Sequence, residues 1–125
     1  MENMKYIRTK DGKLFEYNDD FEKKFQLVWW QKELIEKNEG KFYLDGEIIV
    51  YKIADTIEEL CDGLIVEEKG NESNWFVMDI DEFKNLSYDN KQYQKEHWNF
   101  YAFIKTDKGL IYVAKMNDKG ELKLL

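Results

Sequence analysis

The sequence predicts an α+β fold that is mainly antiparallel β-sheet with one or two short helices. Two observations predict the sheet: β-rich runs flank Asp-Gly turns at residues 11–12 and 45–46, and the C-terminal segment alternates strand-like runs with turns. The helical spacing of apolar residues within 56–62 predicts a helix. A chain of 125 residues that is 43% hydrophobic and 16% aromatic can bury a core, so we expect a single domain over residues 1–125.

Two hairpins are predicted in the first half of the chain. In "MKYIRTKDGKLFEY", residues 4–17, apolar and polar side chains alternate on both sides of Asp11-Gly12, and glycine tolerates positive φ in a tight turn. In "KFYLDGEIIVYKI", residues 41–53, two β-rich runs flank Asp45-Gly46. We therefore expect antiparallel strand pairs in both places.

The intervening segment, residues 18–40, fits two different periods. One set of apolar residues has helical spacing: Phe21, Phe25, Val28 and Ile35. Another set alternates as in a strand: Phe25, Leu27 and Trp29. Acids at 19–20 and Gly40 could bracket a helix, but a helix would point Trp29 and Trp30 to different sides. We interpret the segment as a strand that follows a short turn.

The second half of the chain begins with a predicted helix and continues mainly as strands. In "ADTIEELCDG", Thr56 and Glu59 form a capping box and Gly63 provides a C-terminal stop, which predicts a helix over 56–62. We expect strands in "LIVEE" and "WFVMDI", separated by the polar loop "KGNESN", and a second helical piece within 81–95. The chain should end in a β-meander formed by "WNFYAFIKT", "LIYVAKM" and "ELKLL".

Composition restricts the class of protein. No apolar run approaches the roughly 20 residues of a membrane helix, and the first residues lack the apolar core of a secretory signal, so we expect a cytoplasmic protein without a membrane partner. A net charge of −7 and a pI near 4.8 argue against direct binding of nucleic acid, which basic patches mediate. The sequence contains neither a Walker loop nor a GxGxxG motif, so no nucleotide cofactor is predicted.

Negative charge is concentrated in residues 54–82, where ten acids and a single lysine give a net charge of −9. The ten acids are Asp55, Glu58, Glu59, Asp62, Glu67, Glu68, Glu72, Asp79, Asp81 and Glu82. On one face they would attract a cationic groove and accelerate encounter; the alternative is a solvated face that keeps the protein soluble. Glu58 and Glu59 lie off the apolar stripe and should point outward, whereas Glu67 and Glu68 are strand neighbours that should point to opposite faces.

Candidates for catalysis are few. His97 is the only histidine, and we interpret it as an ordinary surface or strand-edge residue. Cys61, the only cysteine, lies on the apolar stripe of the predicted helix without a neighbouring cation to activate it, so we expect a buried, inert thiol. The acids of "DIDE" could bind a divalent cation but lack the spacing of a calcium loop, and we expect Asp79 or Asp81 to cap the helical turn that follows. The sequence therefore predicts a non-enzymatic protein with no catalytic residue, metal or cofactor.

Aromatic residues indicate a second contact surface. In "VWW" and "WNFYAFIKTDKGLIYV", apolar side chains occupy both faces of the alternation, which fits either strands covered on both sides or one face kept for a partner. Trp29 and Trp30, as neighbours in a strand, would point to opposite faces. One of them is therefore a candidate exposed anchor for a partner protein.

The stretches "KYIRTKDGKLFEY" and "YKIADTIEELCDGLIVEE" resemble a group of small uncharacterised bacteriophage and prophage accessory proteins, which share a "KYIRTKDG" opening and an "ADTIEELCD" helix. The resemblance covers about the first half of the chain and brings no catalytic residue with it. It implies a phage accessory protein, with an action against host defence as the expected role.

We therefore predict a phage-encoded inhibitor that binds a host factor in the host cytoplasm. The expected partner is a protein with a basic groove, such as a nuclease effector complex, which the acidic residues would occupy as a nucleic-acid mimic in an anti-CRISPR-like manner. The alternative is a phage structural or assembly module that self-associates through aromatic strands, and an enzyme is a third class. A monomer suffices for the inhibitor, whereas the assembly module must form oligomers.

Overall fold

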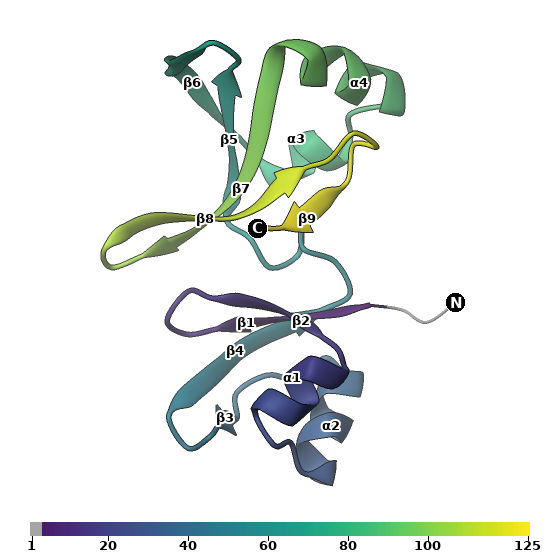
Figure 1. Ribbon diagram of the computed structural model, residues 1–125, viewed down its shortest axis with the longest axis vertical. Coiled ribbons are helices and arrows are strands. Elements are labelled where there is room, and N and C mark those ends of the chain that lie inside the picture. Colours follow the sequence, from purple (N-terminus) through teal and green to yellow (C-terminus); the bar gives the residue numbers. More distant parts are fainter. Residues whose placement is uncertain (1–3) are drawn as a thin grey trace. The chain divides into compact units, whose positions relative to one another are not determined.

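The structure is a computed structural model that describes residues 4–125. The chain divides into two compact units: unit 1 ends at Leu60, and unit 2 extends from Cys61 to Leu125. Each unit has helices and an antiparallel sheet of its own (Figure 1), which confirms the predicted α+β class dominated by antiparallel strands. The expectation of a single domain stays a prediction.

Unit 1 contains a four-stranded sheet, in the order β2-β1-β4-β3, and two helices. Its elements are β1 (Lys5–Thr9), β2 (Leu14–Tyr17), α1 (Asp19–Lys24), α2 (Trp29–Glu36), β3 (Tyr43–Leu44) and β4 (Ile48–Ala54). Both predicted hairpins are confirmed, since β1 pairs antiparallel with β2 and β3 with β4. In the second turn Asp45 and Gly46 have φ values of 52° and 73°, the positive values that a type I′ turn requires.

The prediction of a strand between these hairpins is wrong, because the segment forms α1 and α2. Asn18 begins α1: its Oδ1 accepts a hydrogen bond from the Phe21 backbone N–H at 2.9 Å. Phe21, Phe25 and Ile35 are all buried in one core with residues of β1 and β4. Helical spacing therefore wins because it brings these three side chains to the sheet, while Trp29, which alternation would have buried, is 75% exposed.

The predicted helix over 56–62 is also wrong, since the chain makes only turns and bends there. One backbone hydrogen bond closes the turn, from the Leu60 N–H to the Ile57 carbonyl at 2.9 Å. In a helix over 56–62, the carbonyls of Glu59 and Leu60 would belong to the last turn, whose carbonyls have no partner inside the helix. Here they accept hydrogen bonds from basic side chains of β4 and β1, at 3.1 and 2.8 Å. The capping signal thus starts a single turn that these side chains complete.

Unit 2 contains a five-stranded sheet in the order β6-β5-β7-β8-β9. Its elements are β5 (Gly63–Glu68), β6 (Asn71–Met78), α3 (Ile80–Lys84), α4 (Tyr88–His97), β7 (Trp98–Thr106), β8 (Gly109–Met116) and β9 (Leu122–Leu124). The predicted strands and the C-terminal meander are confirmed. The polar loop predicted between β5 and β6 is shorter than expected, since only Lys69 and Gly70 form the turn and the residues after them extend β6.

The helical piece predicted within 81–95 is present as α3 and α4, which lie beside the sheet of unit 2 (Figure 1). Phe83 of α3 is buried, and its ring centroid lies 6.1 Å from that of Phe100 in β7. Neighbouring strand residues point to opposite faces, so Tyr101 lies on the face that is turned away from Phe83. One face of this sheet is therefore packed against helices, and the other presents its own side chains.

Candidate binding surface

The ten acids of residues 54–82 do not belong to one compact unit. Unit 1 contains Asp55, Glu58 and Glu59. Unit 2 contains Asp62, Glu67, Glu68, Glu72, Asp79, Asp81 and Glu82. Continuity in the sequence therefore does not place the ten carboxylates on one surface.

In unit 1, Asp55 is held by an ion pair. The Lys5 Nζ lies 2.5 Å from the Asp55 Oδ1 and also donates to the Asn38 side chain at 2.9 Å. The hydrogen bond from Lys5 holds the pKa of Asp55 below its ordinary value. Glu59 is exposed, as predicted, whereas Glu58 is half-buried. Of these three acids, Glu59 is the one whose carboxylate is best placed to meet a partner.

Three acids of unit 2 have their carboxylates bound within the fold. The Asp62 Oδ2 accepts a hydrogen bond from the Lys105 backbone N–H at 2.7 Å. The Glu67 carboxylate accepts one from the Tyr112 hydroxyl at 2.7 Å, and the Glu68 carboxylate accepts one from an Asn side chain of β6 at 2.6 Å. These three carboxylates are hydrogen-bonded to other groups of the sheet, so they do more than keep the surface soluble.

The remaining acids of unit 2, Glu72, Asp79, Asp81 and Glu82, are exposed. Asp79 occupies the position before α3 that we predicted for a cap, although its carboxylate makes no capping hydrogen bond. Within residues 4–125, no three His, Cys, Asp or Glu side chains are grouped as a metal site requires. The expectation that no metal is bound stays a prediction.

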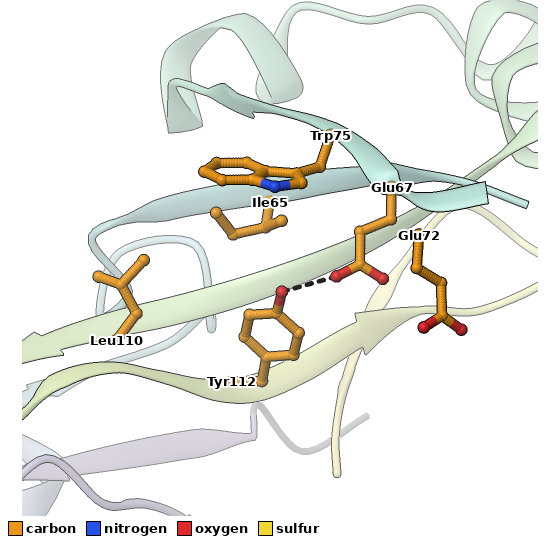
Figure 2. A pocket seen from close by; sticks show the side chains of 6 residues that line it. All are labelled: Ile65, Glu67, Glu72, Trp75, Leu110 and Tyr112. Carbon is orange, nitrogen blue, oxygen red and sulfur yellow. Dashed lines mark hydrogen bonds between the residues drawn. The ribbon is translucent and has the colours of Figure 1, made fainter.

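An open hollow of about 550 Å³ lies on unit 2. It is lined by side chains of β5, β6 and β8: Ile65, Glu67, Glu72, Trp75, Leu110 and Tyr112. The strand register brings them together, because Glu67 is paired with Trp75 across β5 and β6, and paired residues project to the same face. Figure 2 shows the Trp75 indole above Ile65, with Leu110 at one end and the two carboxylates at the other. The hollow is thus apolar along its length and acidic at one end.

Tyr112 fixes the acidic end of the hollow. Its hydroxyl donates to one oxygen of Glu67 (Figure 2), and its ring stacks on that of Tyr101, with centroids 4.9 Å apart and planes 15° apart. Burial and the hydrogen bond to Glu67 raise the pKa of Tyr112 to about 12. The phenol therefore remains protonated at neutral pH, and it orients the Glu67 carboxylate while leaving the second oxygen of that group for another donor.

The apolar walls of the hollow are open to solvent. Trp75 is 54% exposed and Leu110 is 48% exposed. Aromatic and aliphatic side chains of this size that remain exposed beside one another mark contact surfaces more often than scattered single residues do. Glu72 is exposed and makes no hydrogen bond or ion pair within the part of the chain that the structure describes.

Trp29 and Trp30 lie at the start of α2 instead of in a strand, so the prediction that they point to opposite faces of a sheet is wrong. Both are exposed, at 75% and 44%. The Trp30 ring makes an edge contact with Phe42, with centroids 6.1 Å apart. Trp29 is therefore the more exposed of the two candidate anchors, and it belongs to unit 1, not to the hollow.

The two candidate catalytic side chains have the exposure that the sequence suggested, although Cys61 lies in a bend and not on a helix. Cys61 is buried, as predicted. His97 is exposed at the end of α4, with its ring centroid 5.5 Å from that of Tyr93. The interpretation of His97 as a surface residue is confirmed.

Sequence reasoning did not identify the lining of the hollow beyond Glu67 and Glu72. A signal was present in β8, where apolar residues occupy both faces of the alternation, which fits either a strand covered on both sides or one face kept for a partner. The order and register of β6, β5, β7 and β8 decide which residues share that face. No local sequence pattern predicts this order and register.

Comparison with protein-family models, with curated proteins and with solved structures finds no match to this chain. Among residues 4–125, none of the helices has the length and apolar character needed to cross a membrane.

Proposed function

We propose that this chain is a non-enzymatic binding protein whose unit 2 docks on a basic surface of another protein. The observation that carries the proposal is the composition of the hollow, where the exposed side chains of Trp75 and Leu110 share one lining with the carboxylates of Glu67 and Glu72. Aromatic anchors in pockets dominate the energetics of protein interfaces, and charges of one sign select a partner of the opposite sign and accelerate encounter.

The specific form of this function is inhibition of a host factor by a phage-encoded protein in the host cytoplasm. The resemblance of residues 5–17 and 51–68 to phage accessory proteins supports it. A defence nuclease effector complex is a fitting target, because it binds nucleic acid in a channel lined with basic side chains. Exposed acids such as Glu72, Asp81 and Glu82 would meet that channel in place of phosphates.

The experiment is an affinity capture from a lysate of the host, followed by identification of the bound protein and measurement of its affinity for the purified chain. We expect the affinity to fall steeply with salt, because exposed charges are screened over about 8 Å at physiological ionic strength. Nucleic acid should compete with the chain for the same groove. If the affinity for the purified partner depended neither on salt nor on added nucleic acid, the proposal that the acids mimic nucleic acid would be contradicted.

A second candidate function, self-association as a structural or assembly module, is supported by one observation. β6 is an edge strand of the sheet of unit 2, and it exposes Trp75, Phe76 and Val77. An exposed apolar edge strand is a template for pairing with another chain. Sedimentation of the purified protein distinguishes the two functions, since a monomer over the accessible concentration range contradicts assembly.

A further inference from the structure

We infer that the hollow of unit 2 is a receptor for one cationic side chain, lysine or arginine, presented by a basic segment of the partner protein. The inference rests on the proposed function and names the chemical group that this site takes. Three features carry it: the form of the hollow, the order of its lining residues and its charge.

The form of the hollow suits a side chain that enters from another protein surface. Its volume of about 550 Å³ is ample for one long side chain. It is open, and the exposed walls formed by Trp75 and Leu110 face solvent. A ligand that fills the hollow alone keeps part of its surface in solvent, whereas a protein surface placed over the opening would also cover these walls.

The order of the lining matches the two parts of a lysine or arginine side chain. Figure 2 shows Leu110 at one end, Trp75 and Ile65 in the middle, and Glu67 with Glu72 at the other end. Lysine and arginine have an aliphatic stem and a charged head, and they bury the stem along apolar surface. The stem would lie against Trp75 and Leu110, and the head would reach the two carboxylates.

The charge of the hollow selects a cation. Its six lining residues include two carboxylates and no basic side chain. Glu67 uses one oxygen for Tyr112, and Glu72 has no partner among the described residues, so both can accept from an ammonium or a guanidinium group. On the same sheet, the Lys115 Nζ already lies 5.6 Å from the Tyr101 ring centroid, so aromatic rings of this face do accept a lysine head.

The test is a titration of the full chain, followed by nuclear magnetic resonance, with three blocked single residues as probes: acetyl-lysine amide, acetyl-arginine amide and acetyl-norleucine amide. Norleucine keeps a stem and lacks the charge. We expect the Trp75 indole N–H and the Leu110 methyl resonances to shift saturably with the lysine and arginine probes. Affinity for norleucine should be at least tenfold lower.

Variants locate the effect in the hollow. The double variant Glu67→Gln with Glu72→Gln removes both charges, while a glutamine at 67 can still accept from the Tyr112 hydroxyl. It should bind the lysine and arginine probes at least tenfold more weakly. The matched control, Asp89→Asn with Glu96→Gln, removes the same charge from exposed positions of α4 and should leave the affinity unchanged. Dispersion of the amide resonances verifies that each variant is folded.

Equal binding of norleucine would overturn the inference in favour of an apolar groove, and equal weakening by the control variant would overturn it in favour of a diffuse field. Absence of a saturable shift at Trp75 would exclude the site. Because the probes need no partner protein, these outcomes are independent of the capture experiment, whose failure would contradict the proposed function and leave the hollow's preference for a cation intact.

Discussion

Asp62 and Glu72 are both exposed acids of unit 2, but their carboxylates do different things. The Asp62 carboxylate binds the backbone N–H of Lys105 in β7, and the Asp62 N–H donates to the Phe103 carbonyl at 2.9 Å. Asp62 thereby attaches the start of β5 to its neighbouring strand. The Glu72 carboxylate makes no such contact within residues 4–125, so its charge is available for recognition.

Replacing these two acids should change the stability of the protein to different extents. Asp62→Ala should lower the free energy of unfolding by about 1 kcal/mol, because the charge-assisted hydrogen bond to the Lys105 N–H is lost. Glu72→Ala should change it by less than about 0.5 kcal/mol, as is usual for an exposed side chain without partners. Urea denaturation of both variants measures the difference. Equal destabilisation would show that the Asp62 bond does not stabilise the fold.

Ionisation of Tyr112 should make the stability of the folded protein depend on pH in the alkaline range. Its pKa in the folded state is raised to about 12, first by burial and then by the hydrogen bond to Glu67. A raised pKa stabilises the folded state below the ordinary tyrosine pKa of about 10, and this contribution is lost as the pH rises toward about 12. The wild-type protein should therefore lose more stability over that range than Tyr112→Phe does.

Urea midpoints measured for both proteins at several pH values between about 9 and 12 test this expectation. Lysine and the other tyrosines titrate in both proteins, so the difference between the two curves isolates Tyr112. Parallel curves would mean that the phenol is no harder to ionise in the folded state than in the unfolded one.

At the scale of elements, the buried side-chain amide of Gln31 holds α2 in place. Gln31 is only 9% exposed, and both ends of its side chain are used: Oε1 accepts from the Val28 N–H at 2.9 Å, and Nε2 donates to the Tyr43 carbonyl at 3.0 Å. The first bond caps the start of the helix, and the second attaches the helix to β3. One side chain therefore decides both where α2 begins and which strand it meets.

Gln31→Ala should lower the free energy of unfolding by about 1–2 kcal/mol, because two hydrogen bonds are lost and a partly buried space is left. Glu36→Ala, at an exposed position of the same helix, is the control and should change stability by less than about 0.5 kcal/mol. Thermal or chemical unfolding followed by circular dichroism measures both. A loss for Glu36→Ala as large as that for Gln31→Ala would show that helix propensity, not the amide, dominates.

The elements that the sequence predicted correctly depend on neighbours in the chain, and those it predicted wrongly depend on distant ones. The Asp45-Gly46 turn needs only two residues with positive φ, so its hairpin is readable from a dipeptide. The turn at 56–62 is stabilised instead by Lys52 and Arg8, whose side chains donate to the carbonyls of Glu59 and Leu60. Nothing in the local spacing reveals those two donors.

The candidate site follows the same rule. The concentration of acids was visible in the sequence, but its division between two units was not, and neither was the engagement of Asp62 or Glu67 within the sheet. Trp75 and Tyr112 come together because β6 and β8 lie in one sheet, with β5 and β7 between them. A pattern of alternation predicts that each strand has an available face, but not which side chains share it.

On the scale of the whole molecule, the two units carry similar charge. Residues 1–60 contain fourteen acids and ten basic residues, and residues 61–125 contain twelve acids and nine basic residues, which gives −4 and −3. The acidic segment contributes −3 to unit 1, whose other residues add −1, and −6 to unit 2, whose other residues contribute +3. Individual acids are also paired, as Asp55 is with Lys5. Recognition of a basic partner therefore depends on particular exposed carboxylates more than on net charge.

Charge reversal at those carboxylates is the sharpest test of this view. The triple variant Glu72→Lys, Asp81→Lys and Glu82→Lys should remain folded, because exposed charges seldom contribute more than about 1 kcal/mol each. Its affinity for the partner identified by capture should fall at least tenfold, and the remaining affinity should depend less on salt. The matched triple variant Asp89→Lys, Glu96→Lys and Asp107→Lys makes the same change of charge at exposed positions of unit 2 outside the acidic segment.

Affinity measured at low and at physiological ionic strength distinguishes a specific contact from a general field. If particular carboxylates make the contact, the second triple variant keeps most of its affinity, since charges more than about 8 Å from the interface are largely screened. If both triple variants lose affinity equally, the partner responds to the net charge of unit 2. If the first triple variant binds as the wild type does, Glu72, Asp81 and Glu82 take no part in the contact. The exposed aromatic side chains then become the candidate contact, and the variants Trp75→Ala and Trp29→Ala show which of the two units carries it.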